Sequence, residues 1–182
     1  MSPAPLLYEY DSTAFSRWLV LDRDGTINQD SGYTHAPSEL TILPGVISTL
    51  AELNAGGWGL LIASNQAGLA RGLFTVAQME DFNQALIDQL AAVGILISGI
   101  AVCPHHPDGS VPEWSGICQC RKPETGLFDT LAKSYGLDLE RTMFVGNSQI
   151  DREAAERAGM LFMWGRNAQD WAEILESFRA TA

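Results

Sequence analysis

Two carboxylates separated by a single residue follow an apolar run near the start of the chain. The stretch WLVLDRDGTINQD, residues 18–30, places Asp22 at the end of the run and Asp24 two positions later. Neighbouring carboxylates repel each other, so such a pair is favoured where a cation lies between them. Mg²⁺ takes oxygen ligands and leaves positions for waters and a substrate phosphate. One carboxylate could then attack phosphorus while the other transfers a proton, so the pair predicts phosphoryl chemistry.

The acidic pair has two other interpretations. A single D-x-D can be a turn with solvated acids. A calcium loop of the EF-hand type needs Gly at its sixth position and Glu at its twelfth, but counting from Asp22 these positions hold Ile27 and Tyr33. The spacing therefore excludes that loop. Gly25 suits a tight turn that aims backbone N–H groups at a phosphate.

The elements that must position this pair alternate along the chain. Thr75 and Gln78 have the spacing of a capping box at the start of one helix. Strands that are buried on both faces and separated by helices are typical of a parallel sheet with right-handed crossovers. The predicted strands end at residue 21 or span 58–64, 97–103, 142–147 and 160–165, and the predicted helices lie within 44–57, 75–94, 124–136, 150–159 and 168–180.

Unusual residues fall at the ends of several predicted strands. Asp22, Ser64, Cys103 and Asn147 each lie at or just past such an end. In open α/β sheets, ligands bind outside the carboxyl ends of the strands. We therefore expect these four residues to meet at one rim of the sheet.

Length and charge limit the class of protein. The 182 residues suit one domain, which we expect over residues 17–182, with residues 1–16 as a loosely held N-terminal extension. The formal net charge of −11 disfavours nucleic acid and anionic membranes, which need basic surface. No apolar run approaches the roughly 18 residues of a membrane span, and the N-terminus does not resemble a signal peptide. We therefore expect a cytoplasmic protein.

A loop rich in cysteine and histidine precedes one of the predicted helices. Residues 103–123, CPHHPDGSVPEWSGICQCRKP, hold every cysteine of the chain and two of its three histidines. An odd number of cysteines in a cytoplasmic chain argues against disulfides. Three thiols and one imidazole suit tetrahedral Zn²⁺, which would order a loop that has few apolar residues. The predicted zinc loop spans 103–120, its ligands being Cys103, Cys118, Cys120 and either His105 or His106.

Four motifs in order resemble those of the haloacid-dehalogenase-like (HAD) phosphatases. They are DRDGT, ASNQAG, CRKP and VGNSQID, and the match covers residues 18–165, most of the chain. The resemblance implies an α/β fold of the HAD-like Rossmannoid kind. This is a three-layer α/β/α sandwich with a central parallel sheet, here with a zinc-binding loop and without a large cap domain.

The same resemblance implies a role for each motif. Asp22 would attack the phosphate and form an aspartyl-phosphate, and Asp24 would act first as general acid and then as general base. Ser64 and Lys122 would stabilise the transferring phosphoryl group. The catalytic Mg²⁺ would be held by Asp22, by the backbone carbonyl of Asp24 and by Asn147.

Asn147 departs from the family pattern, which has Asp at this position. Its side chain still offers a carbonyl oxygen to Mg²⁺ but no charge, so we expect weaker metal binding. Asp151, one helical turn further on, could compensate for the missing charge by binding the metal ion directly or through water. The same departure would also suit a binding protein on a HAD fold that has lost its activity.

The cysteine loop resembles that of one group in the family, the D-glycero-D-manno-heptose 1,7-bisphosphate 7-phosphatases, and that of the histidinol-phosphate phosphatases. Both carry a C-x-H…C-x-C zinc loop, which selects His105 as the fourth ligand. The resemblance implies a small phosphorylated metabolite as substrate, with heptose bisphosphate favoured and histidinol phosphate as the alternative. We expect a monomer. The implied substrate-binding residues are Arg23, Asp30, Tyr33, Asn65, Gln66, Arg121 and Ser148, with Arg71 as a further phosphate contact.

Overall fold

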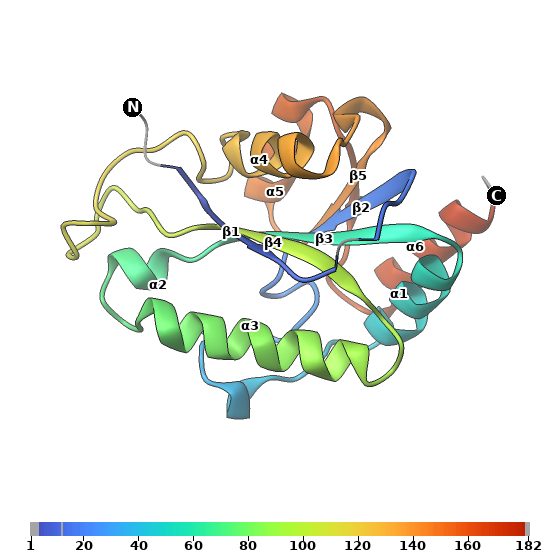
Figure 1. Cartoon of the computed structure of the whole chain (residues 1–182), viewed down its shortest axis with the longest axis horizontal. Coiled ribbons are helices and arrows are strands. Elements are labelled where there is room, and N and C mark those ends of the chain that lie inside the picture. Colours follow the sequence, from blue (N-terminus) through green and yellow to red (C-terminus); the bar gives the residue numbers. More distant parts are fainter. Residues whose placement is uncertain (1–3, 12, 181–182) are drawn as a thin grey trace.

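A central sheet with helices on both faces makes up the protein (Figure 1). The computed structural model describes residues 4–11 and 13–180. The strands are β1 (Leu6–Glu9), β2 (Arg17–Leu21), β3 (Trp58–Asn65), β4 (Ile97–Cys103), β5 (Met143–Gly146) and β6 (Leu161–Trp164). The α-helices are α1 (Val46–Ala55), α2 (Ala67–Ala70), α3 (Val76–Ala91), α4 (Gly126–Tyr135), α5 (Gln149–Ala158) and α6 (Ala168–Arg179), and short 3-10 helices span Pro37–Glu39 and Leu139–Arg141.

The strands lie in the order β1-β4-β3-β2-β5-β6, and all neighbours from β4 to β6 are parallel. Helices α4 and α5 cover one face, while α1, α3 and α6 cover the other (Figure 1). This confirms the three-layer sandwich with a mostly parallel sheet. A loop that follows β4 stands beyond the strand ends. The described part of the chain contains no separate cap domain there. None of the helices described is both long and apolar enough to cross a bilayer.

The centre of the sheet is a continuous apolar core. Residues 19–21 of β2 and 60–63 of β3 are fully buried, because helices cover both faces. Burying an aliphatic side chain of this kind contributes roughly 1.5–3 kcal/mol. The apolar strands therefore hold their carboxyl ends, and the residues that follow them, in fixed positions.

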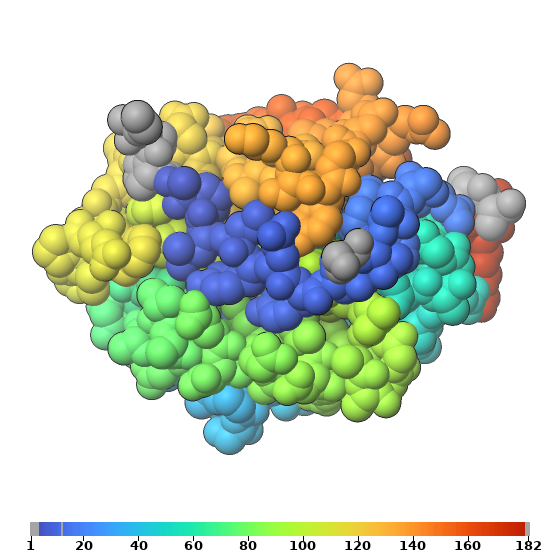
Figure 2. Space-filling view, in the orientation of Figure 1, coloured from blue at the N-terminus to red at the C-terminus, as the bar shows by residue number. Residues whose placement is uncertain are grey.

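The N-terminal segment differs from expectation. Leu6–Glu9 forms β1, which pairs antiparallel with β4 and closes one edge of the sheet. Leu6, Tyr8 and Tyr10 pack against the core. Figure 2 shows this segment in blue between the orange α4 and the green α3. The loose attachment that we expected is therefore wrong for Leu6–Glu9, because backbone pairing at the sheet edge holds a strand that is too short to stand out in the sequence.

Helix α3 begins as the sequence predicts. The side chain of Thr75 accepts a hydrogen bond from the backbone N–H of Gln78, and the Gln78 side chain accepts one from the backbone N–H of Thr75. This confirms the capping box. The helix buries both Phe82 and its neighbour Asn83, a polar residue in an apolar interface.

Candidate active site

The ends of three adjacent strands form the floor of a pocket. Because β2 pairs with β3 on one side and β5 on the other, the residues after these strands converge. The pocket has a volume of about 410 Å³ and is completed by the loop between β4 and α4. Its lining includes nearly every residue predicted from the sequence: Asp22, Asp24, Asp30, Tyr33, Ser64, Asn65, Gln66, Arg121, Lys122, Asn147 and Ser148. Only Arg23 of the predicted catalytic and substrate-binding residues is absent from that lining.

Lys122 provides a buried positive charge on the floor. Its Nζ lies 2.7 Å from Oδ1 of Asp22 and 2.6 Å from Oδ1 of Asp151, and it donates to the carbonyl of Ala63 at 2.9 Å. The side chain is 2% exposed. Burial disfavours the ammonium, but the two carboxylates outweigh burial and raise the pKa of Lys122. Lys122 therefore stays charged against the position where a phosphate would sit.

The pKa of Asp22 is raised to about 7 in the metal-free protein. Burial is the largest cause, Lys122 acts against it, and the negative charges of Asp151 and Asp24 add to it. A divalent cation beside this carboxyl would favour its charged form. The site is thus built to hold a nucleophilic carboxylate together with a cation.

Asp151 organises the turn that follows β5. Its Oδ2 accepts hydrogen bonds from the backbone N–H groups of Asn147 and Ser148 and from the Ser148 hydroxyl at 2.6 Å. Ser148 in turn caps α5. Burial acts to raise the pKa of Asp151, but Lys122 and Ser148 outweigh it and lower the pKa. The contacts of Asp151 are with this turn and with Lys122, which is a role that the sequence did not reveal.

Gly25 allows Asn147 to approach the loop after β2. Gly25 has φ of +77°, and a Cβ built there would lie 2.0 Å from the Asn147 side-chain nitrogen. Only glycine accommodates both the backbone conformation and this contact. Asn147 is thereby brought to the wall that holds Asp22. A carboxylate and a carboxamide supply hard oxygen donors, so these residues fit a cation such as Mg²⁺.

Asp24 is surrounded by donors. Its carboxylate accepts from Arg23 Nε and NH2, from Asn28 Nδ2 at 3.0 Å and from Gln66 Nε2 at 2.7 Å. Arg23 was expected to contact substrate, but it is 1% exposed and does not line the pocket. The physical reason is the alternation of side chains past a strand end. Asp22 and Asp24 face the pocket, so the residue between them points into the protein.

Amides at the end of β3 connect the other parts of the floor. Gln66 Nε2 donates to Ser64 Oγ at 2.8 Å as well as to Asp24. Asn65 Nδ2 donates to the carbonyl of Lys122, and the N–H of Lys122 donates back to Asn65 Oδ1. This reciprocal pair attaches the cysteine loop to the sheet. Ser64 itself is 1% exposed and lines the pocket.

Three side chains with basic nitrogens line the same pocket as the acidic residues, and we call them the basic rim. Arg71, His106 and Arg121 all line the pocket, and Arg71 NH2 lies 3.4 Å from His106 Nε2. Burial, with the charges of Arg121 and Arg71, lowers the pKa of His106, and its Nδ1 accepts the backbone N–H of Asp108. The Arg71 guanidinium also lies over the ring of Tyr33. The sequence analysis considered His106 only as an alternative zinc ligand and gave it no role in the pocket, although its position within the cysteine loop was a usable signal.

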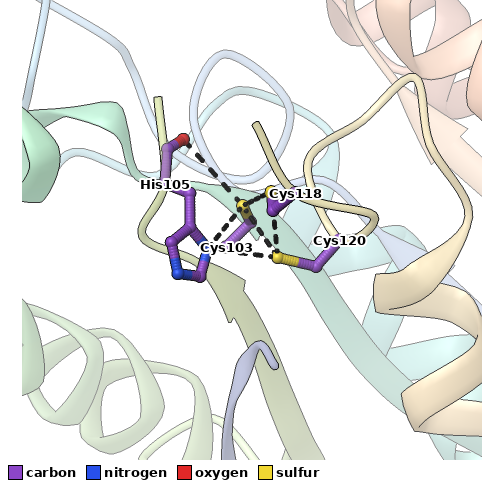
Figure 3. A group of neighbouring side chains, drawn as sticks. All are labelled: Cys103, His105, Cys118 and Cys120. Carbon is purple, nitrogen blue, oxygen red and sulfur yellow. Dashed lines mark hydrogen bonds between the residues drawn. The ribbon is translucent and has the colours of Figure 1, made fainter. Parts of the chain in front are cut away.

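The cysteine loop folds into a compact cluster (Figure 3). The three sulfurs lie 3.1–3.6 Å apart, and His105 Nδ1 lies 3.3 Å from the sulfur of Cys120. The four ligand atoms are within 4.8 Å of one another, and all four residues are buried. A hydrogen bond from Cys120 is the main cause that lowers the pKa of Cys103 to about 6. The cluster selects His105 over His106 and could hold a tetrahedral metal ion such as Zn²⁺.

A direct contact connects this cluster with the pocket. The backbone N–H of Arg121 donates to the sulfur of Cys118 at 3.3 Å, and the Arg121 guanidinium donates to the carbonyl of His105 at 3.3 Å. Lys122 is the next residue. Ordering the cluster therefore orders the segment that carries both basic side chains into the pocket.

Known proteins share this sequence and arrangement. The HAD-hydrolase-like family matches residues 119–175. A D-glycero-beta-D-manno-heptose-1,7-bisphosphate 7-phosphatase of Escherichia coli is 38% identical over 164 residues, which is 84% of this chain and 86% of the relative.

Solved structures agree with the sequence comparison. A HAD-like phosphatase from Mesorhizobium loti superimposes with a TM-score of 0.88 at 26% identity, over 98% of this chain and 94% of its own. The D,D-heptose 1,7-bisphosphate phosphatase of B. bronchiseptica, complexed with magnesium and phosphate, gives a TM-score of 0.78 at 32% identity, over 91% and 99% of the two chains. With the pocket and its ordered motifs, these matches show that the chain belongs to the HAD family of phosphatases.

Proposed function

We propose that this protein is a Mg²⁺-dependent phosphomonoesterase that works through an aspartyl-phosphate on Asp22. The observation that carries the proposal is the pairing of Asp22 with Lys122 at 2.7 Å on the floor of an open pocket. A nucleophilic oxygen and a fixed cation thus stand where phosphorus and its oxygens would bind. Asp24 and Ser64 line the same floor.

Asp22, the backbone carbonyl of Asp24 and the side chain of Asn147 would hold the metal. When bound, Mg²⁺ neutralises charge on the phosphoryl oxygens and orients the phosphate. Asn147 brings no negative charge to this set, which supports weaker metal binding than a second carboxylate would give. Asp151 is engaged by Lys122 and Ser148, so it supports the site by fixing these groups.

In the first half of the reaction, an oxygen of Asp22 attacks phosphorus and the ester P–O bond breaks. Asp24 gives a proton to the departing alcohol oxygen. Ser64 and Lys122 stabilise the negative charge on the transferring group, which is the main demand of phosphoryl transfer. The products are the free alcohol and phosphorylated Asp22.

In the second half, Asp24 takes a proton from a water whose oxygen attacks the same phosphorus. The bond between Asp22 and phosphorus breaks, and inorganic phosphate leaves. Asp22 returns as a carboxylate and Asp24 is protonated for the next cycle. Substitution Asp22→Asn removes the nucleophile and should abolish turnover of any phosphate ester. Retained activity in that variant would disprove this mechanism and the covalent role of Asp22.

The favoured substrate is D-glycero-D-manno-heptose 1,7-bisphosphate, with the 7-phosphate removed. The Escherichia coli relative and the B. bronchiseptica structure are named as heptose bisphosphate phosphatases, and the basic rim of Arg71 and Arg121 supports a substrate with a second anionic group. The volume of about 410 Å³ leaves room beyond one phosphate. Asp30, Tyr33 and Ser148 would contact the sugar from the pocket walls.

A substrate panel tests this choice. The specificity constant kcat/KM should be highest for heptose bisphosphate and lower for histidinol phosphate, which lacks a second phosphate for the rim. A higher value for histidinol phosphate would assign the protein to the alternative. Absence of hydrolysis for every ester, with metal bound, would favour the catalytically weakened binding protein that Asn147 allows.

The cysteine cluster is proposed as a structural zinc site. Its four ligands are all protein atoms, which leaves no open position for catalysis. Three free buried thiols also suit a reducing compartment, so we propose that the enzyme acts in the cytoplasm, and as a monomer. Sedimentation at micromolar concentration and cell fractionation would measure these two properties.

A further inference from the structure

Arg23 makes an unusually complete set of contacts for a buried charge. Its Nε and NH2 donate to the carboxylate of Asp24, the latter at 2.9 Å, and NH2 also donates to the carbonyl of Thr34 at 3.2 Å. Its NH1 donates to Oδ1 of Asn83 at 2.7 Å, and the guanidinium lies 4.5 Å above the ring of Phe82. Burying a cation is costly unless it is paired in this way.

Asn83 is the anchor of this arrangement outside the pocket. It lies in α3, is 0% exposed and does not line the pocket. Its oxygen is used by Arg23, while its Nδ2 has no hydrogen-bond partner. An amide in an apolar interface with half of its hydrogen bonds unmade destabilises the fold, so contact with Arg23 is the interaction that explains a polar residue here.

The geometry of Asp24 follows from Arg23. The planar guanidinium forms a fork that meets both carboxylate oxygens, and such forks fix the orientation of their partner. Asn28, which is buried, and Gln66, which lines the pocket, donate to the same oxygens. The carboxylate of Asp24 is therefore held in one orientation at the pocket wall by Arg23, which does not itself line the pocket.

We propose that Arg23, fixed by Asn83 and Phe82 of α3, is a positioning residue that holds Asp24 as the base of the second half of the reaction. This inference rests on the proposed function. Asp24 accepts the proton of the attacking water, the water oxygen bonds to phosphorus and the Asp22–phosphorus bond breaks. A carboxylate that is already oriented suits this step. Loss of the anchor lets the carboxylate turn, and small misplacements of a catalytic group lower rates strongly.

The test uses p-nitrophenyl phosphate, because nitrophenolate is a stable anion that leaves without a proton from Asp24. The first half then depends little on Asp24, and only release of phosphate from Asp22 requires the base. Rapid mixing of enzyme, Mg²⁺ and this ester measures both halves. Asn83→Leu removes the amide that anchors Arg23 and replaces it with an apolar side chain of similar volume. Arg23→Lys keeps the charge but cannot make the fork. Leu86→Val, on the same buried face of α3, is the matched control for packing.

In Asn83→Leu and Arg23→Lys we expect a burst of about one nitrophenolate per active site, followed by steady turnover at least ~10-fold below the wild type, because general base catalysis contributes ~10²–10⁴. Leu86→Val should keep wild-type turnover. The proposal is overturned if burst and steady rates fall by the same factor, or if steady turnover is unchanged. If Asn83→Leu does not fold, Arg23→Lys carries the test. Activity in Asp22→Asn would sink the proposed function instead, so the two failures are distinguishable.

Discussion

The ammonium nitrogen of Lys122 lies 2.7 Å from a carboxylate oxygen of Asp22, although 100 residues separate the two in the chain. A carboxylate oxygen of Asp151 lies 2.6 Å from the same ammonium. One buried cation thus connects the ends of β2 and β5 with the cysteine loop. Both stability and activity depend on it.

Substitution Lys122→Met leaves Asp22 and Asp151 buried without their cation. Removing one partner of a buried ion pair typically destabilises by ~3–5 kcal/mol, so we expect a lower Tm of the metal-free protein and loss of phosphatase activity. Thermal unfolding and ester hydrolysis measure the two effects. Lys133→Met, at an exposed position of α4, should change neither. An active, equally stable Lys122→Met would contradict this account of the floor.

Substitution Gly25→Ala should weaken metal binding through Asn147. The added Cβ would lie 2.0 Å from the Asn147 side-chain nitrogen, whereas at Gly57, which also has positive φ, nothing lies within 4 Å. Both variants suffer backbone strain, but only Gly25→Ala displaces Asn147. We expect the Mg²⁺ concentration for half-maximal activity to rise several-fold in Gly25→Ala and to stay unchanged in Gly57→Ala. Equal values for the two would refute the role of this contact.

The raised pKa of Asp22 predicts how stability of the metal-free protein depends on pH. An unfolded aspartate titrates near pH 3.9, and folding raises the pKa of Asp22 to about 7. Between these values the folded state binds more protons than the unfolded state, so the contribution of Asp22 to stability falls as pH rises from about 4 to 7 and is constant above.

Asp22→Asn removes that dependence. As pH rises over the same range, the free energy of unfolding of the metal-free wild type should fall by a few kcal/mol relative to this variant, roughly 1.4 kcal/mol per pKa unit. Denaturant unfolding at several pH values, with chelator present, gives the difference. Mg²⁺ should restore wild-type stability at pH 8 but not that of Asp22→Asn. A loss of wild-type stability, relative to the variant, that grew as pH fell would have the wrong sign.

Substitution Cys118→Ser should remove the metal from the cysteine cluster and disorder the segment that carries Arg121. We expect elemental analysis to find one zinc ion per wild-type chain and less in the variant, together with a lower Tm and reduced activity. Ser115→Ala, in the same loop but outside the cluster, is the control. Full activity of a zinc-free protein would separate the loop from catalysis.

Substitution Arg71→Gln tests the basic rim. If the rim binds a second phosphate, KM for heptose bisphosphate should rise by roughly 10- to 100-fold, since a charge-assisted hydrogen bond is worth ~1.5–3 kcal/mol, while KM for p-nitrophenyl phosphate stays the same. Arg152→Gln removes an exposed arginine of α5 that does not line the pocket and should change neither value. Equal increases for both esters would indicate a general effect of charge.

Much of this molecule follows from local patterns. The apolar runs before Asp22 and after Gly57 predict central strands because helices must cover both of their faces. Since parallel strands end at one edge, the same order of elements predicts that Asp22, Ser64 and Asn147 converge. The clustering of every cysteine within 18 positions of its loop, 103–120, likewise predicts a metal-binding cluster. These inferences need only chain order and the chemistry of each residue type.

Only the tertiary structure decided in which direction side chains point and which residues far apart in the chain become partners. Arg23 faces α3 and not the pocket, because side chains alternate past a strand end. There it donates a hydrogen bond to Asn83, which is 60 residues away in the chain. Asp151 pairs with Lys122, His106 joins the basic rim, and Leu6–Glu9 completes the sheet edge. Sequence spacing determines which residues can share an element, but only packing between elements determines which way a side chain points and what neutralises it.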